Sequence, residues 1–157
     1  PEADRDGKMY DLAVNGQHPR ALVISCIDSR VSPSMIFKVE PGEILNHRHI
    51  AGFVPPYDPA WELPGSQILA VAASIEFAVR NLNVESIIIK GHTHCGGIAA
   101  YVEGTASPLV RAWMENVQPI LGKLDRTLDQ AALLRQAEEE CIKCSFRNLI
   151  SYPTVRC

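Results

Sequence analysis

Unbroken apolar runs, rather than alternating patterns, mark the predicted strands of this chain. Residues 21–24 are Ala, Leu, Val and Ile, and residues 87–89 are three consecutive isoleucines. Short apolar runs of β-favouring residues are typical of strands buried on both faces, as in a parallel sheet. The pattern predicts strands at the first run and over 85–90. A further strand is predicted over 43–48, after the turn signal Pro41-Gly42.

Helices are predicted between and after these strands. Ser32 and Pro33 suit the N-cap and first position of a short helix. Gly65-Ser66 is expected to cap a helix that runs to about Asn81. Four apolar residues at helical spacing are expected to lie on one face of that helix: Ile68, Ala72, Ile75 and Val79. Later helices are predicted over 97–103, 108–123 and 128–150.

The alternation of strands and helices predicts an α/β fold in which helices flank a sheet with a parallel core. A length of 157 residues is typical of one domain, which is predicted over 1–157. It is too short for two domains that each bury a hydrophobic core of ordinary size. Residues 1–15 are weakly patterned and are expected to form an N-terminal arm. Residues 54–64 hold four prolines and are expected to form an exposed loop.

Composition narrows the class of protein. The hydrophobic fraction of 46% and the charged fraction of 21% are typical of a soluble globular domain. Fifteen basic and eighteen acidic residues give a net charge of −3, which indicates no nucleic-acid partner. No apolar stretch approaches the ~18 residues of a membrane span, so no membrane partner is expected. Five cysteines, an odd number, favour a reducing compartment, cytoplasmic or organellar, with thiols kept for metal or packing.

Chemically reactive residues follow two of the predicted strands where each apolar run ends. The first run is followed by Cys26, Asp28 and Arg30, and the isoleucine run by His92 and Cys95. Ligands of open α/β sheets bind beyond the carboxyl ends of the strands, so these side chains are expected to meet at one edge. Two thiolates and one imidazole are the ligands of a zinc site that keeps its fourth position for water.

Other interpretations of these residues stay open at this point. His94 competes with His92 as the third ligand, because spacing alone does not choose between them. A disulfide between Cys26 and Cys95 would leave the histidine and the Asp–Arg pair unexplained. A structural zinc knuckle usually has four closely spaced ligands, which the chain lacks. The Asp–Arg pair can also be a plain surface ion pair.

The pattern Cys26-x-Asp28-x-Arg30, followed by His92-x-x-Cys95-Gly96-Gly97, resembles the zinc signature of the β-class carbonic anhydrases, nearest their plant-type branch. Further blocks resemble the same family and run in the same order: Arg48–Ala51, Val54–Asp58, Ile75–Val79 and Ser151–Arg156. The resemblance extends from about Gly16 to Arg156. The family's sheet has more strand material after the Tyr-Pro segment. This chain ends at Cys157 and is expected to lack this C-terminal strand material, either because the protein is a shortened member of the family or because its tail lies outside the given sequence.

The resemblance implies zinc-dependent, reversible hydration of carbon dioxide to bicarbonate and a proton by zinc-bound hydroxide. One Zn²⁺ per chain would be held by Cys26, His92 and Cys95. Asp28 would orient the hydroxide and Arg30 would keep Asp28 ionised. A carbon disulfide or carbonyl sulfide hydrolase on the same scaffold is an alternative, and so is a non-catalytic zinc-binding homologue. The family further implies a homodimer or a higher homo-oligomer.

The resemblance also assigns a substrate pocket. Gln17 stands where plant-type members place a substrate-contacting glutamine that reaches across a dimer interface. Leu45, Ile50 and Phe77 align with pocket positions, with Leu45 in place of an aromatic residue and Phe77 in place of a tyrosine. Gly96 belongs to the same expected site.

Three residues outside that pocket also carry expectations. His49 stands where the family commonly has an asparagine, and it is expected either to relay protons or to be a packed surface histidine. Cys141 and Cys144 lie three apart on a predicted helix, on one face. They are expected to be small core residues rather than ligands of a second metal.

Overall fold

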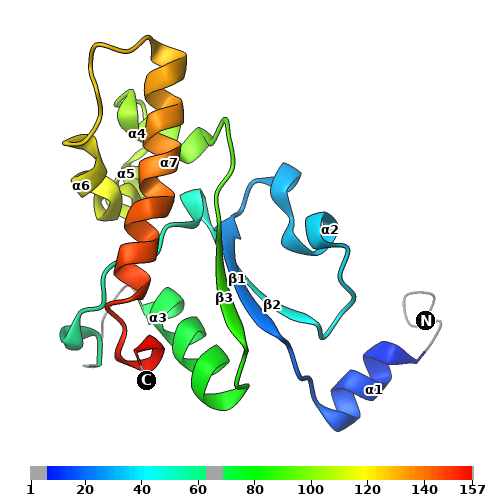
Figure 1. Ribbon diagram of the computed structural model, residues 1–157. Helices are drawn as coiled ribbons and strands as arrows, with labels where there is room; N and C mark the ends of the chain where they lie inside the picture. The colour runs from blue at the N-terminus through cyan, green and yellow to red at the C-terminus, as the bar shows by residue number, and fades with distance from the viewer. Residues whose placement is uncertain (1–6, 63–68, 157) are drawn as a thin grey trace.

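The computed structural model describes residues 7–62 and 69–156. Within these ranges the sheet has three parallel strands in the order β2-β1-β3 (Figure 1). They are β1 (Ala21–Cys26), β2 (Ile44–His49) and β3 (Ser86–Lys90), which confirms the predicted strands. Every residue of β1 is buried, as its unbroken apolar run predicts. The expected α/β fold with a parallel core is confirmed.

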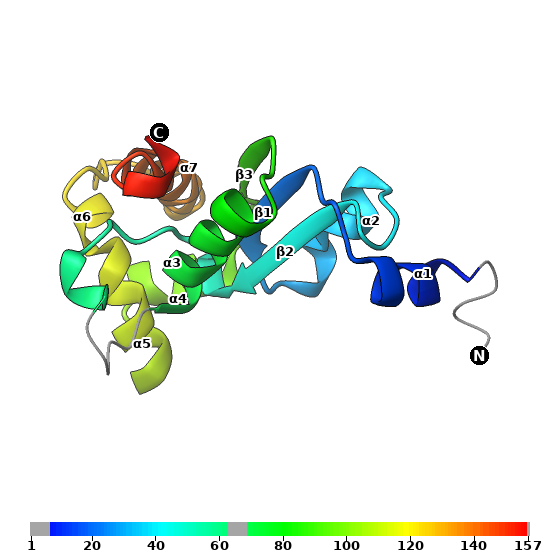
Figure 2. The ribbon, with the colours of Figure 1, turned by 90° about the horizontal axis from the view of Figure 1, so that it is seen from below.

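Seven α-helices are assigned in the described residues: α1 (Lys8–Asn15), α2 (Pro33–Phe37), α3 (Leu69–Glu76), α4 (Gly96–Val102), α5 (Pro108–Met114), α6 (Gln118–Leu121) and α7 (Gln130–Leu149). A π-helical turn, Phe77–Asn81, continues α3, and no strand follows β3 among residues 91–156. Figures 1 and 2 show α4, α5 and α6 beyond one end of the strands, whereas α1 projects away from the rest of the molecule. In Figure 1, α7 starts beside α4 to α6 and runs down next to β3. None of the described helices has the length and hydrophobicity that a membrane crossing needs.

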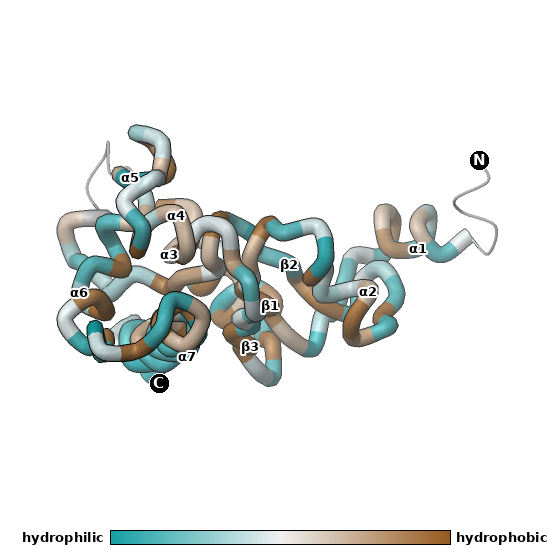
Figure 3. The backbone as a smooth tube through the Cα atoms, turned by 90° about the horizontal axis from the view of Figure 1, so that it is seen from above, coloured by the Kyte–Doolittle hydropathy of each residue, from teal (hydrophilic) through white to brown (hydrophobic). Residues whose placement is uncertain are grey.

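Two hydrophobic clusters hold the layers together. One joins Leu22 and Ile24 of β1 to Val71, Ile75 and Ala78 of α3 and its π-helical continuation. The other lies around the carboxyl end of β1 and is formed with α4 to α7. Figure 3 shows the hydrophobic colour along the central strands. The second cluster includes two of the sequence-predicted ligands, so the candidate site is built on the core.

Some predicted helices differ from the observed ones. The helix predicted over 108–123 is broken into α5, a 3₁₀ turn at Glu115–Val117, and α6. Pro119 explains the break, since proline lacks the amide N–H and clashes with the preceding turn. Ser32 occupies the N-cap of α2 and Pro33 its first turn, but the Ser32 side chain makes no capping bond.

The buried face of α3 and its π-helical continuation differs from the predicted face. Ile75 is buried as expected, but the other buried residues are Val71 and Ala78 rather than Ala72 and Val79. Ile68 and the predicted cap Gly65-Ser66 lie outside the described residues.

The loop that starts at Val54 was expected to be exposed, and for its first residues this is wrong. Val54 and Pro55 are buried beneath the end of α7. The Ser145 hydroxyl accepts a hydrogen bond from the Val54 N–H, and the Asn148 side-chain amide donates to the Val54 carbonyl. The Tyr152 hydroxyl donates to the Pro55 carbonyl. Because these backbone groups have partners on α7 and just beyond it, the loop can be buried without cost.

Gly52 lets the segment after β2 approach the end of β1 closely. It ends a 3₁₀ turn, Ile50–Gly52, and has a φ of +61°. A Cβ at this position would lie 2.7 Å from the carbonyl carbon of Ser25 and 2.8 Å from the amide nitrogen of Cys26. Both neighbouring atoms are backbone and cannot move aside. Glycine at this position therefore brings Ile50 next to Cys26.

We expect the Gly52→Ala variant to be destabilised by about 3 kcal/mol, because the substitution adds a backbone clash to a left-handed φ. Gly122→Ala is the matched control: that residue has a φ of −70°, and an added Cβ meets no atom within 4 Å. The measurement is the free energy of unfolding by urea. Equal stability of the two variants would show that the contact between Gly52 and β1 relaxes without cost.

Candidate metal centre

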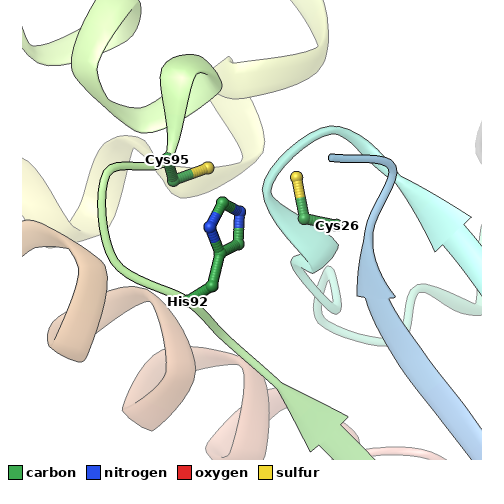
Figure 4. Close-up of side chains that lie close together, drawn as sticks. All are labelled: Cys26, His92 and Cys95. Carbon is green, nitrogen blue, oxygen red and sulfur yellow. The ribbon is translucent and has the colours of Figure 1, made fainter. Parts of the chain in front are cut away.

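Three side chains meet where the strands end. Cys26 is the last residue of β1, His92 follows β3 by two residues, and Cys95 occupies the N-cap of α4. One ligand atom from each of these residues lies within 4.8 Å of the other two. Figure 4 shows the His92 ring between the two sulfur atoms. Both cysteines are buried. The parallel pairing of β1 with β3 brings Cys26 to His92 and Cys95, which lie 66 and 69 positions further along the chain.

The donor set and its hydrogen bonds fit a zinc ion. The His92 Nδ1 lies 2.9 Å from the carbonyl oxygen of Thr93, so Nδ1–H is the donor and Nε2 keeps its lone pair. That Nε2 is buried and has no hydrogen-bond partner among the described residues. A metal ligand needs this tautomer, with the remote nitrogen fixed by a backbone carbonyl. An unpartnered imidazole nitrogen beside two thiols matches the ligands of a three-residue zinc site.

His94, the competing candidate, is not part of this group. Its side chain is exposed and its backbone has a φ of 54°. The loop therefore turns His94 outward while His92 faces the cysteines. The backbone of the loop therefore favours His92 over His94 as the third candidate ligand.

The two thiols share a hydrogen bond and differ in acidity. The hydrogen bond from Cys95 lowers the pKa of Cys26 to about 5. The same contact, together with burial, raises the pKa of the Cys95 thiol. The four cysteines within the described ranges are free thiols, so the disulfide alternative for Cys26 and Cys95 does not hold. The two opposite shifts favour a single shared proton that stays on Cys95.

Asp28 and Arg30 form a two-pronged ion pair beside the metal group. The Arg30 Nε lies 2.9 Å from the Asp28 Oδ1, and one terminal nitrogen lies 2.6 Å from the Oδ2. The Arg30 amide N–H also donates to the Oδ1 at 2.9 Å. These bonds hold the pKa of the Asp28 carboxyl well below its usual range. The Asp28 side chain is 19% exposed and the Arg30 side chain 61%, so the carboxylate is the more shielded partner of the pair.

Arg48 supports this segment and was not singled out as a site residue. From β2, its guanidinium donates to the carbonyl oxygens of Cys26 at 3.0 Å and of Asp28 at 2.7 Å. The two bonds hold the backbone that carries the first predicted ligand and the carboxylate. A cation within a predicted strand is a weak signal for this role, because the sequence does not show which carbonyl groups it reaches.

A cavity of about 350 Å³ opens next to the metal group. Four expected site residues line it: Cys26, Asp28, Ile50 and Gly96. The remaining lining includes residues that were not expected, among them Ala100, Ala106 and Val110. These come from α4, α5 and the loop between them and have small apolar side chains. No sequence signal distinguishes them from ordinary packing residues.

Three expected pocket residues lie away from this cavity in the single chain. Gln17 is exposed, four residues before β1. Leu45 packs into the cluster with α3, and Phe77 starts the π-helical turn with half of its surface exposed. A substrate role for any of them would need a partner chain.

The other candidate residues have structural environments. His49 packs edge-on against Trp113, and its Nε2 lies 2.7 Å from the Phe53 carbonyl oxygen. Burial lowers its pKa to about 4, which is far from the neutral value expected of a proton relay. Cys141 and Cys144 are buried in the second hydrophobic cluster, as expected of core residues. Burial raises the pKa of Cys141 to about 12.

Comparison with known proteins agrees with this site. The carbonic anhydrase family model matches residues 21–157. Among curated proteins, β-carbonic anhydrase 3 of Arabidopsis thaliana is 34% identical over 98% of this chain and 60% of its own length. The mitochondrial β-carbonic anhydrase 6 of the same plant is 38% identical over 95% of this chain and 51% of its own length. The chain thus spans less than two thirds of either relative.

A solved structure is similar along nearly the whole chain. One of two tetrameric β-carbonic anhydrases of the fungus Sordaria macrospora has a TM-score of 0.81 and 27% identity, over 99% of this chain and 76% of that one. The family match, the plant relatives and this fold agree with one another. The chain belongs to the β-carbonic anhydrase family.

The shared proton makes a prediction for the metal-free chain. One thiolate should be present on Cys26 at neutral pH and should be lost as the pH falls through about 5, because the hydrogen bond from Cys95 lowers the pKa of Cys26. The measurement is the ultraviolet thiolate absorption of the metal-free protein as a function of pH. Cys141→Ser is the control and should keep this transition, because burial raises the pKa of Cys141, whereas Cys26→Ser should lose it. A wild-type chain without a thiolate at neutral pH would contradict the shared-proton arrangement.

Proposed function

We propose that this protein is a zinc-dependent carbonic anhydrase that interconverts carbon dioxide and bicarbonate. The observation that carries the proposal is that Cys26, which belongs to the metal group, and Asp28 line the same cavity. A purely structural zinc site has no use for a paired carboxylate at its open side. The plant relatives at 34% and 38% identity are themselves named β-carbonic anhydrases.

Cys26, His92 and Cys95 would hold one Zn²⁺ per chain. Zinc in such a site acts as a Lewis acid and makes water a nucleophile near neutral pH. The remaining chemistry belongs to the chain. The Asp28 carboxylate, kept ionised by Arg30, can accept the hydrogen bond of the attacking hydroxyl group and so direct its lone pair into the cavity. Ile50, with the small apolar residues beside it, suits carbon dioxide, a small apolar substrate.

Gln17, Leu45 and Phe77 are proposed to complete the pocket of a partner chain in a homodimer or larger assembly. None of them lines the cavity of its own chain, and the Sordaria relative is described as tetrameric. Gln17 lies near α1, which projects from the molecule in Figure 1 and exposes Met9, Tyr10 and Val14. We also propose a reducing compartment, cytoplasmic or organellar, because the site uses free thiols.

Asp28→Asn and Arg30→Ala test the proposed function. Both variants should keep about one zinc per chain, since neither residue is a ligand, but should lose about 100-fold or more in carbon dioxide hydration. Arg80→Ala, which breaks an exposed ion pair with Glu76, is the control and should keep full turnover. The measurements are stopped-flow hydration and zinc content on the same samples.

The same preparations separate the alternatives. Turnover of carbonyl sulfide or carbon disulfide without hydration would favour the hydrolase. Stoichiometric zinc without any turnover would favour a non-catalytic homologue. Unchanged hydration activity in both the Asp28→Asn and the Arg30→Ala variant would show that these two residues form only a surface ion pair.

The partner role of Gln17 can be tested by mixing two inactive variants. Gln17→Ala keeps its metal ligands, and Cys26→Ser keeps its glutamine. If Gln17 acts in the partner's pocket, each hybrid dimer has one intact site, and an equal mixture should recover about a quarter of the wild-type activity. The measurement is hydration activity after subunit exchange, with hybrids verified by differential tagging. Verified hybrids without activity would contradict a role across the interface.

A further inference from the structure

One peptide group in the loop before α4 is held from both sides by charged side chains. The carbonyl oxygen of His94 accepts a hydrogen bond from the Arg30 guanidinium at 3.0 Å. The N–H of Cys95 donates to the Glu138 Oε1 at 2.9 Å. Both atoms belong to the peptide plane that joins His94 to Cys95, and this plane is rigid. Two opposite contacts therefore set its orientation, and with it the direction in which the Cys95 side chain leaves the backbone.

This peptide needs external support. His94 adopts a left-handed φ of 54°, which is disfavoured for a residue with a side chain. Its side chain is exposed, so packing does not hold it in place. Cys95 stands at the N-cap of α4 without a side-chain capping bond, and its own N–H bond to Glu138 is buried. The contacts of Arg30 and Glu138 stabilise a conformation that the loop would not adopt alone.

Glu138 is unusual among the acidic residues of α7. It is the one charged residue in the buried class across 7–60 and 69–156, where side-chain exposure is described. Its neighbours on the helix have cationic partners: Glu139 pairs with Arg135, and Glu140 with Lys143. Glu138 is in none of the ion pairs found in the described residues, and its hydrogen bond goes to the Cys95 N–H. Burying a carboxylate is costly, so this bond to the metal loop is its main compensation.

We propose that Glu138 is a positioning residue for the metal centre. By accepting from the Cys95 N–H, it fixes the peptide plane opposite Arg30 and sets the Cys95 sulfur at its distance from Cys26 and His92. The inference rests on the proposed function in one respect, that these three residues bind zinc. Because Arg30 also binds both oxygens of Asp28, the same peptide links the metal loop to the carboxylate at the cavity.

The test replaces Glu138 by leucine, which has no acceptor, by aspartate, which is too short to reach the N–H, and by glutamine, which keeps an acceptor oxygen at the same distance. Loss of such an outer contact typically weakens metal binding by about 10- to 100-fold. We expect that loss of zinc affinity in the Glu138→Leu and Glu138→Asp variants. Glu138→Gln should stay within about threefold of wild type, since its amide oxygen can accept the same bond. Glu139→Leu, one residue further along α7 and exposed, is the matched control.

Two measurements on the purified chain distinguish positioning from general stability. The zinc dissociation constant is obtained by chelator competition. The absorption of the Co²⁺-loaded protein reports the geometry of the two thiolates and should change in the leucine and aspartate variants while remaining like wild type in the glutamine variant. The aspartate variant keeps the charge, so it tests the contact even if the leucine variant does not fold.

The outcomes separate this inference from the proposed function. Wild-type zinc affinity and Co²⁺ absorption in Glu138→Asp would overturn the inference alone, leaving Glu138 as a packing residue. A glutamine variant as impaired as the aspartate variant would also overturn it, because the hydrogen bond would not be the cause. A wild-type chain that binds no metal would overturn the proposed function and this inference with it.

Discussion

The parallel pairing of β1 with β3 is the constraint on which the site depends. The register pairs Ala21 with Ser86 and Ser25 with Lys90, so both strands end at the same edge of the sheet. Cys26 ends one strand and His92 follows the other, and the sulfur and nitrogen atoms meet only in this register. A shift by one residue would turn the Cys26 side chain to the other face of the sheet, away from the histidine.

Around that edge, charged side chains hold the backbone, in addition to the ion pair between Asp28 and Arg30. Arg48 binds two carbonyl groups of the segment after β1, Arg30 binds the carbonyl of His94, and Glu138 binds the N–H of Cys95. These segments are short loops, and loops alone do not keep three ligand atoms at coordination distances. These loops lie beyond the hydrogen-bonded strands, so charge-assisted hydrogen bonds to their backbone make them rigid.

The cavity combines two environments that the proposed reaction requires. Small apolar side chains from α4 and α5 form one wall, and the ionised Asp28 stands beside the metal group. Gly52 and the Ile50 carbonyl, which accepts from the Trp113 indole N–H at 2.9 Å, fix the segment between them. The apolar wall is thereby anchored to the same backbone that holds the first ligand. The same site can then bind a small apolar substrate and stabilise a polar transition state.

Short-range patterns were enough to predict the three strands and to place Cys26, Asp28, Arg30 and Cys95 at strand ends, because each of these features depends on residues close in sequence. They left His92 and His94 as alternatives, and only the resemblance to a family assigned the Cys26, His92 and Cys95 group. Tertiary structure decided what depends on partners far along the chain. It turned His94 outward, buried Val54 beneath Ser145, and moved His49 away from a neutral pKa by packing it against Trp113. It also brought Glu138 to the Cys95 N–H across 43 residues. The physical reason is the same in each case. A hydrogen bond or a buried environment is formed by two segments that lie far apart in the sequence, whereas a sequence pattern describes only one segment at a time.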